Sequence, residues 1–160
     1  RTNRWARPLN GQLVLNTDAS LLEDHTGSCG AVIRDHLGCF VAASTSKLDH
    51  VADVESAEAA ALLEGLKLAC SIGANTLVAR TDNVTMVQAM ENNSGQSMVA
   101  GPILDECRLL CLDFGDVFFQ HCNRESNMVA HRLAQRGRED QPVVWLDAPL
   151  VLFRCYLRMM

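Results

Sequence analysis

The sequence has few of the features that mark membrane-spanning, fibrous and zinc-binding proteins. Its apolar stretch near the C-terminus, residues 149–153, is far shorter than the roughly 20 residues needed to cross a bilayer. It contains no C-x-x-C and no H-E-x-x-H motif, the usual sequence signatures of zinc sites. The content of 48% hydrophobic and 21% charged residues is typical of a globular domain. A chain of 160 residues has room for one such domain.

Basic charge is scarce in the middle of the chain. Residues 15–119 hold 5 basic and 15 acidic side chains, a local balance of −10. The basic residues gather instead at residues 1–14 and 120–138, which each carry a net charge of +3. Affinity for nucleic acid comes largely from neutralising phosphates. The acidic body therefore argues against a general nucleic-acid binder, but it allows a carboxylate site that holds cations beside a local basic strip.

Seven cysteines are present, an odd number, and no two of them form a C-x-x-C pair. Such a set predicts reduced thiols in the core of an intracellular protein. The alternative is a metal or redox site built from some of the thiols.

Hydrophobic periodicity predicts an α/β domain. Short apolar runs at residues 12–18, 29–33 and 39–45 are joined by tight connections and predict an antiparallel meander. The later elements are a helix at 53–72, a strand at 76–80, helices at 83–91 and 102–112, a strand at 117–121 and a helix at 126–136. Strands separated by helices pair in parallel. We therefore expect a mixed five-stranded sheet with helices on both faces, in a domain covering residues 11–137 with extensions at 1–10 and 138–160.

Three carboxylates are predicted to meet at one end of this sheet. Glu58 lies in the middle of the apolar arc of its helix, where a charge is costly unless it is paired. Asp18 and Asp82 each end an apolar strand, and open α/β sheets collect their chemistry at the carboxyl ends of strands. Taken singly, Glu58 is also explained as a hydrogen-bonded residue near a helix N-terminus, and each Asp as a turn former. Together, three crowded carboxylates require cations, and hard oxygen ligands favour Mg²⁺ or Mn²⁺.

Five short segments then occur in order along the chain. They are residues 16–20 (NTDAS), 30–35 (GAVIRD) with Gly38, 57–59 with 61–62 and 65–66, 81–83 (TDN), and 121–127 (HCNRESN) running into 130–134 (AHRLA). With these segments the chain resembles the type 1 ribonuclease H family. It is most similar to the retrotransposon-like, reverse-transcriptase-associated subgroup that is abundant in plant genomes. The resemblance covers about residues 5–136.

The resemblance implies an RNase H-like fold and cleavage of the RNA strand of RNA–DNA hybrids by two divalent ions, one activating water and the other stabilising the leaving 3′ oxygen. It implies that Asp18 bridges both ions while Glu58 and Asp82 complete the ligand shell. His121 matches a histidine thought to assist proton transfer or product release. The substrate contacts implied or expected near the site are Ser20, Asn83, Arg124 and Asn127. The resemblance is also compatible with a place inside a larger retroelement-derived protein.

One position departs from the family pattern. Where many relatives carry a fourth aspartate, this chain has His131. Asn127 and His131 lie four residues apart and share a helix face, so His131 is expected to point toward the site as a metal ligand. Neutral imidazole is a poorer ligand for Mg²⁺ than a carboxylate is. We expect weaker binding of one cation, more reliance on Mn²⁺ and a lower rate.

Two other functions stay open at this stage. The first is a catalytically weak or inactive RNase H-like domain that binds nucleic acid or a protein. The second is a 3′–5′ exonuclease on the same fold, which commonly carries an Asp-x-Glu pair on its first strand. Ser20 stands two residues after Asp18 here, which argues against the exonuclease.

Overall fold

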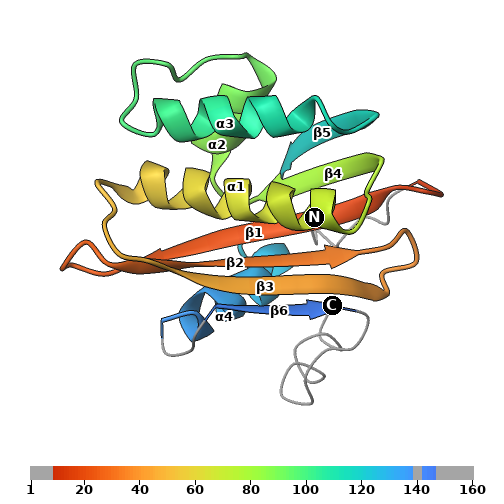
Figure 1. Ribbon diagram of the computed structural model, residues 1–160, viewed down its shortest axis with the longest axis horizontal. Helices are drawn as coiled ribbons and strands as arrows, with labels where there is room; N and C mark the ends of the chain where they lie inside the picture. Colours follow the sequence, from red (N-terminus) through yellow and green to blue (C-terminus); the bar gives the residue numbers. More distant parts are fainter. Residues whose placement is uncertain (1–8, 139–141, 147–160) are drawn as a thin grey trace.

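A six-stranded mixed sheet organises the part of the chain that the computed structural model describes, residues 9–138 and 142–146 (Figure 1). The strand order across the sheet is β5-β4-β1-β2-β3-β6. Strands β1, β4 and β5 are parallel to one another, and the other neighbours are antiparallel. The strands are β1 (Leu13–Leu21), β2 (Gly27–Arg34), β3 (Phe40–Leu48), β4 (Thr76–Thr81), β5 (Asp116–His121) and β6 (Val143–Leu146).

The prediction of five strands was wrong, because β6 adds a sixth. This strand pairs antiparallel with β3, with Trp145 opposite Ala43. Trp145 is buried in a small cluster that also contains Val32 and Leu133. The strand has only four residues and lies in the region that the sequence assigned to a C-terminal extension. Its pairing depends on a distant contact rather than on its own periodicity.

Helices cover both faces of the sheet, as predicted. They are α1 (Val54–Ser71), α2 (Val84–Glu91), α3 (Gly101–Cys111) and α4 (Met128–Arg136), with a short 3₁₀ turn at Glu125–Asn127. Side chains alternate along each strand. Leu15 and Ile33 therefore pack with Leu66 of α1, whereas Val32 packs with Leu133 of α4. In Figure 1, α1 and α4 lie on opposite sides of the sheet.

Two helix starts are fixed by acceptor side chains just before them. The Asp53 carboxylate accepts a hydrogen bond from the Ser56 backbone N–H at 2.7 Å. The Asn83 side-chain oxygen accepts one from the Met86 backbone N–H at 3.1 Å. Such caps satisfy backbone donors that the first turn of a helix leaves without partners. They fix where α1 and α2 begin, and so where Glu58 and Asp82 stand.

None of the described helices is both long enough and apolar enough to cross a membrane.

Candidate active site

Two aspartates lie at the same end of the parallel strand pair β1 and β4. The β1–β4 pairing ends with Asn16 opposite Arg80. Asp18 and Asp82 each follow two residues beyond that last pair, so their side chains leave the two strands at the same level. Strand β1 runs further than the sequence predicted, with Asp18 still paired to Gly30 of β2. Asp18 is therefore paired with β2 on one side of its strand, whereas on the other side it lies beyond the last residue of β1 that pairs with β4.

Glu58 of α1 completes a group of three carboxylates. Asp18, Glu58 and Asp82 each offer an oxygen within 4.8 Å of the oxygens of the other two. Glu58 and Asp18 are only 7% and 5% exposed. The convergence expected from the sequence thus occurs, with residues that lie 40 and 24 positions apart in the chain.

The crowding raises the pKa of two of these carboxyl groups. Burial, followed by the negative charges of Asp18 and Asp82, raises the pKa of Glu58 to about 9. Burial also raises the pKa of Asp18, although the hydrogen bond from His131 opposes that rise. Glu58 Oε2 is buried and has no hydrogen-bond partner among the described residues. A set of hard oxygen donors that repel one another, two of them buried, fits a divalent cation such as Mg²⁺ or Mn²⁺.

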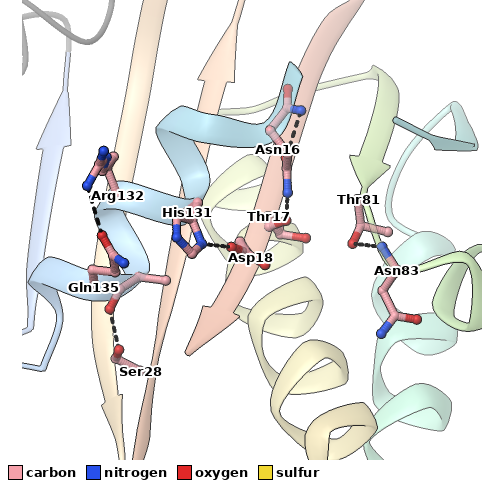
Figure 2. Close-up of polar contacts among 11 residues, drawn as sticks. Asn16, Thr17, Asp18, Ser28, Thr81, Asn83, His131, Arg132 and Gln135 are labelled. Carbon is pink, nitrogen blue, oxygen red and sulfur yellow. Dashed lines mark hydrogen bonds and ion pairs between the residues drawn. The ribbon is translucent and has the colours of Figure 1, made fainter. Parts of the chain in front are cut away.

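His131 reaches the site from α4 on the other face of the sheet. Its Nδ1 lies 2.8 Å from Asp18 Oδ2 (Figure 2). Within the described residues, the three-carboxylate cluster does not include His131. The imidazole therefore contacts one carboxylate of the group rather than standing among all three.

His121 and Asn83 lie beside Asp82. His121, at the end of β5, is exposed, and its Nε2 lies 3.2 Å from the Asp82 backbone carbonyl. Asn83 receives structural contacts: its N–H donates to Thr81 Oγ1 (Figure 2) and its side-chain oxygen caps α2. Both residues are thus near the cluster, and the Asn83 oxygen is already engaged.

The remaining predicted contact residues differ in accessibility. Arg124 is exposed, just before the 3₁₀ turn that leads into α4. Ser20 is 5% exposed, two residues beyond Asp18. Asn127 is 1% exposed, and both ends of its amide are bonded inside the protein. This geometry favours an internal role for Asn127 over the direct substrate contact that the sequence predicted.

Sequence reasoning missed two buried polar residues behind the site. Asn16 is 1% exposed and Arg34 is 2% exposed, and they are hydrogen-bonded to each other. Both were present in the matching segments, but only as part of a pattern. The signal that could have identified them is that each is a polar residue inside an apolar strand, where it needs a partner.

The six described cysteines are free. Burial raises the pKa of Cys29 and Cys107 to about 12, so these thiols stay protonated and apolar in character near neutral pH. Among the described residues no cysteine joins a cluster of metal-ligating side chains.

Comparison with known proteins gives a consistent result. The sequence model of a family described as reverse transcriptase-like matches residues 16–137. Among solved structures, RNase H1 from the halophilic archaeon Halobacterium salinarum has a TM-score of 0.75 at 21% identity, covering 81% of this chain and 98% of its own. The N-terminal RNase H domain of a Mycobacterium tuberculosis protein has a TM-score of 0.73 at 21% identity, covering 79% and 92%.

A third similar structure is LC11-RNase H1 in complex with an RNA/DNA hybrid, with a TM-score of 0.71 at 18% identity, covering 78% of this chain and 94% of its own. No curated protein sequence matches the chain. These structural likenesses show the RNase H-like fold that the sequence predicts.

Proposed function

This chain belongs to the reverse transcriptase-like family, and on that premise we propose that it is a metal-dependent endonuclease that hydrolyses the RNA strand of RNA–DNA hybrids. The observation that carries the proposal is the meeting of Asp18, Glu58 and Asp82 within 4.8 Å of one another. The likeness of the fold to RNase H1 structures, one of them bound to a hybrid, supports the choice of substrate. The match to a reverse transcriptase-like family supports a place for the chain in a larger retroelement-derived protein.

Asp18, Glu58 and Asp82, with His131 as a further ligand, are the residues that would hold the two divalent ions. Bound divalent ions supply Lewis-acid charge that activates water for attack on the phosphodiester and stabilises the leaving 3′ oxygen. The protein contributes a pre-formed ligand set, with Asp18 and Glu58 buried, which lowers the cost of assembling like charges at the moment of binding. Glu58 must lose its proton when it becomes a ligand, and this loss couples metal binding to pH.

His121 is proposed to move a proton. It is exposed and lies beside Asp82. An imidazole ring carries one nitrogen that can accept a proton and one that can donate one, so His121 can accept a proton from the attacking water or donate one to the leaving oxygen. Its hydrogen bond to a backbone carbonyl orients the ring without involving a carboxylate of the cluster.

Contacts to the hybrid are proposed from Ser20, Asn83 and Arg124. The exposed guanidinium of Arg124 suits a phosphate. The small polar groups near Asp18 and Asp82 suit the 2′-hydroxyls that distinguish RNA from DNA.

A cleavage assay tests the proposal. The protein is incubated with a hybrid labelled on the RNA strand, in Mg²⁺ and separately in Mn²⁺, beside Asp82→Asn. We expect cleavage of the RNA strand by the native chain and a loss of cleavage to background in Asp82→Asn. That variant keeps the size and polarity of the side chain but removes one metal-binding charge.

A second candidate function is favoured by the contact between His131 and Asp18. A histidine that is bonded to a carboxylate oxygen of the cluster weakens Mg²⁺ binding at the site. A domain that only binds nucleic acid or a protein does not need strong Mg²⁺ binding, so it would tolerate this histidine. Equal hybrid binding by the native chain and Asp82→Asn, with no cutting in either metal, would favour this function over the nuclease.

A further inference from the structure

A line of buried hydrogen bonds runs behind the carboxylate cluster, outside the set of residues proposed to touch metal or substrate. Arg34 Nη2 donates to Asn16 Oδ1 at 3.1 Å. Asn16 Nδ2 donates to Asn127 Oδ1 at 3.0 Å. Asn127 Nδ2 donates to the Thr17 backbone carbonyl at 2.9 Å. We call these three side chains the Arg34–Asn16–Asn127 network; none is more than 2% exposed.

The direction of every bond in this network is fixed by its two ends. A guanidinium can only donate, and a backbone carbonyl can only accept. Asn16 must therefore turn its oxygen toward Arg34, and Asn127 must turn its nitrogen toward Thr17. Bonds aligned in one direction in a low-dielectric interior strengthen one another, and the charge at the arginine end adds to the effect. The network therefore has one defined arrangement.

The end of the network lies next to a proposed metal ligand. The Thr17 carbonyl belongs to the same peptide group as the Asp18 amide nitrogen. Asn127 stands immediately before α4, and His131, one turn further along α4, contacts Asp18 Oδ2. Two groups at the start of α4 therefore hold Asp18. Asn127 bonds the peptide group that precedes Asp18, and His131 contacts the Asp18 carboxylate.

The network requires a charged guanidinium to be removed from water, a free-energy cost that apolar residues in the same place would avoid. Burial, followed by repulsion from Arg80, lowers the pKa of Arg34 to about 10, so the guanidinium is still charged at neutral pH although it is almost wholly removed from water. Buried charged groups contribute little to stability compared with apolar residues of similar size, but they can specify one arrangement among several. A role in placing Asp18 explains why such a group lies here.

We propose that the Arg34–Asn16–Asn127 network is a positioning device that fixes Asp18 in the orientation required for divalent-ion binding. Its members are positioning residues and touch neither metal nor substrate. The inference rests on the proposed function at one point, the binding of divalent ions at Asp18. It assigns Asn127 to the support of Asp18 instead of the hybrid.

The test compares Asn127→Ala with Ser28→Ala. Ser28 is wholly buried and donates a hydrogen bond to the Ala134 carbonyl of α4 (Figure 2), so its loss also removes a buried bond to this helix but leaves the Thr17–Asp18 peptide untouched. Mn²⁺ binding is measured from the electron paramagnetic resonance signal of the free ion. We expect Asn127→Ala to weaken Mn²⁺ binding by about tenfold, in the range seen when partners of metal ligands are removed. Ser28→Ala should leave Mn²⁺ binding unchanged while lowering the melting temperature.

Steady-state kinetics on the hybrid provide a second readout. A positioning role predicts a fall in kcat for Asn127→Ala with KM within about twofold of the native value, whereas a lost substrate contact predicts a rise in KM. Unchanged Mn²⁺ binding in a folded Asn127→Ala overturns the proposal, as does an effect of equal size in Ser28→Ala. If Asn127→Ala does not fold, Asn127→Ser shortens the same amide, keeps a polar group and is judged by the same criteria.

A metal-free measurement separates this inference from the proposed function. The ¹⁵N chemical shift of the Asp18 amide reports on the hydrogen bond to the Thr17 carbonyl, because both belong to one peptide group. We expect this shift to change in Asn127→Ala and to stay constant in Ser28→Ala. If the native chain binds no Mn²⁺, the proposed function fails, and a constant Asp18 shift in Asn127→Ala would overturn the network as well.

Discussion

The two faces of the central sheet are built from different chemistry, although the same strands supply both. On the face covered by α1, Leu15 and Ile33 pack against Leu66 in the main hydrophobic cluster. The face covered by α4 has a smaller apolar cluster around Val32 and Leu133, but there the same two strands also present Asn16 and Arg34, both buried and hydrogen-bonded. Glu58 comes from the first face and His131 from the second. They meet at Asp18, where β1 extends beyond its pairing with β4.

The difference shows how a site with buried charges can have both a stable fold around it and a defined position for its charged groups. Apolar packing is non-directional, so the α1 face can supply stability without fixing the orientation of a polar group. Hydrogen bonds depend steeply on distance and angle, so the α4 face can define where Asp18 stands. Asp18 lies where the two faces meet, because a metal ligand needs both a stable surrounding fold and a fixed orientation.

The two faces can be separated experimentally by adding one methyl group to each, and the larger effect is expected on the α4 side. A Cβ at Gly30 would collide with the Ala130 carbonyl and the Ala134 N–H of α4. Because backbone cannot rotate away, Gly30→Ala must push α4 off the sheet. We expect a loss of about 3 kcal/mol in the free energy of unfolding, read from thermal denaturation. We also expect reduced Mn²⁺ binding, because Asn127 and His131 would move with the helix.

Gly65→Ala is the matched control on the α1 side. A Cβ there would meet side-chain atoms of Thr17 and Leu15 rather than backbone, so the contact can be relieved by small side-chain shifts without moving a helix off the sheet. Alanine also favours a helix interior over glycine by up to about 1 kcal/mol, which offsets part of the crowding. The expected change is within about 1 kcal/mol, with Mn²⁺ binding retained. Similar losses in both variants would contradict the distinction between a flexible face and a fixed one.

The next effect in size concerns the charge contributed by the α1 face. The pKa of Glu58 is raised from 4.5 to about 9 in the folded protein. The folded state therefore holds a proton that the unfolded state has lost between these values, and stability falls as the pH rises through that window. Without metal, Glu58→Gln should remove most of this fall and raise the melting temperature at pH 8 by on the order of 5 °C.

The control for Glu58 is Glu64→Gln on the same helix. The Glu64 side chain is 39% exposed and paired with Lys67, so its loss should leave the pH dependence intact. Melting curves in chelator between pH 5 and pH 9 measure both variants. A melting temperature of the native chain that does not fall over this range would contradict the raised pKa. Adding Mg²⁺ should restore stability to the native chain but much less to Glu58→Gln.

The sequence was sufficient for the parts of the fold that depend on local pattern. The alternation in β1 and the alanine-rich helix around Glu58 predicted both elements and the side of the helix that faces the sheet. The meeting of Asp18 with Asp82 followed from two parallel strands and was present in the structure. These features were predictable because each is set by residues close together in the chain or by a general rule of sheet topology.

Contacts between distant segments were not predictable in the same way. Strand β6 is too short to show a period, and it exists because Trp145 finds a buried place on β3. Asn16 stands out in the sequence as a polar residue inside an apolar strand, but nothing near it indicates that its partners are Arg34 and Asn127. The side chain of His131 could be directed toward the site, but its bond to Asp18 Oδ2 depends on how closely α4 approaches the sheet.

The smallest expected effect concerns His131, an α4 side chain that contacts a carboxylate of the cluster. Replacing it with aspartate adds a hard oxygen donor where an imidazole now pairs with Asp18. We expect His131→Asp to increase Mg²⁺-supported cleavage by about tenfold, in the range typical for changes beside a metal site, with a smaller gain in Mn²⁺. The control is His131→Asn, which removes the imidazole without adding charge and should bring no gain in Mg²⁺. If His131→Asp instead lowers cleavage in both metals, the imidazole is needed where it stands, and the α4 face supplies a working ligand rather than a substitute for a missing carboxylate.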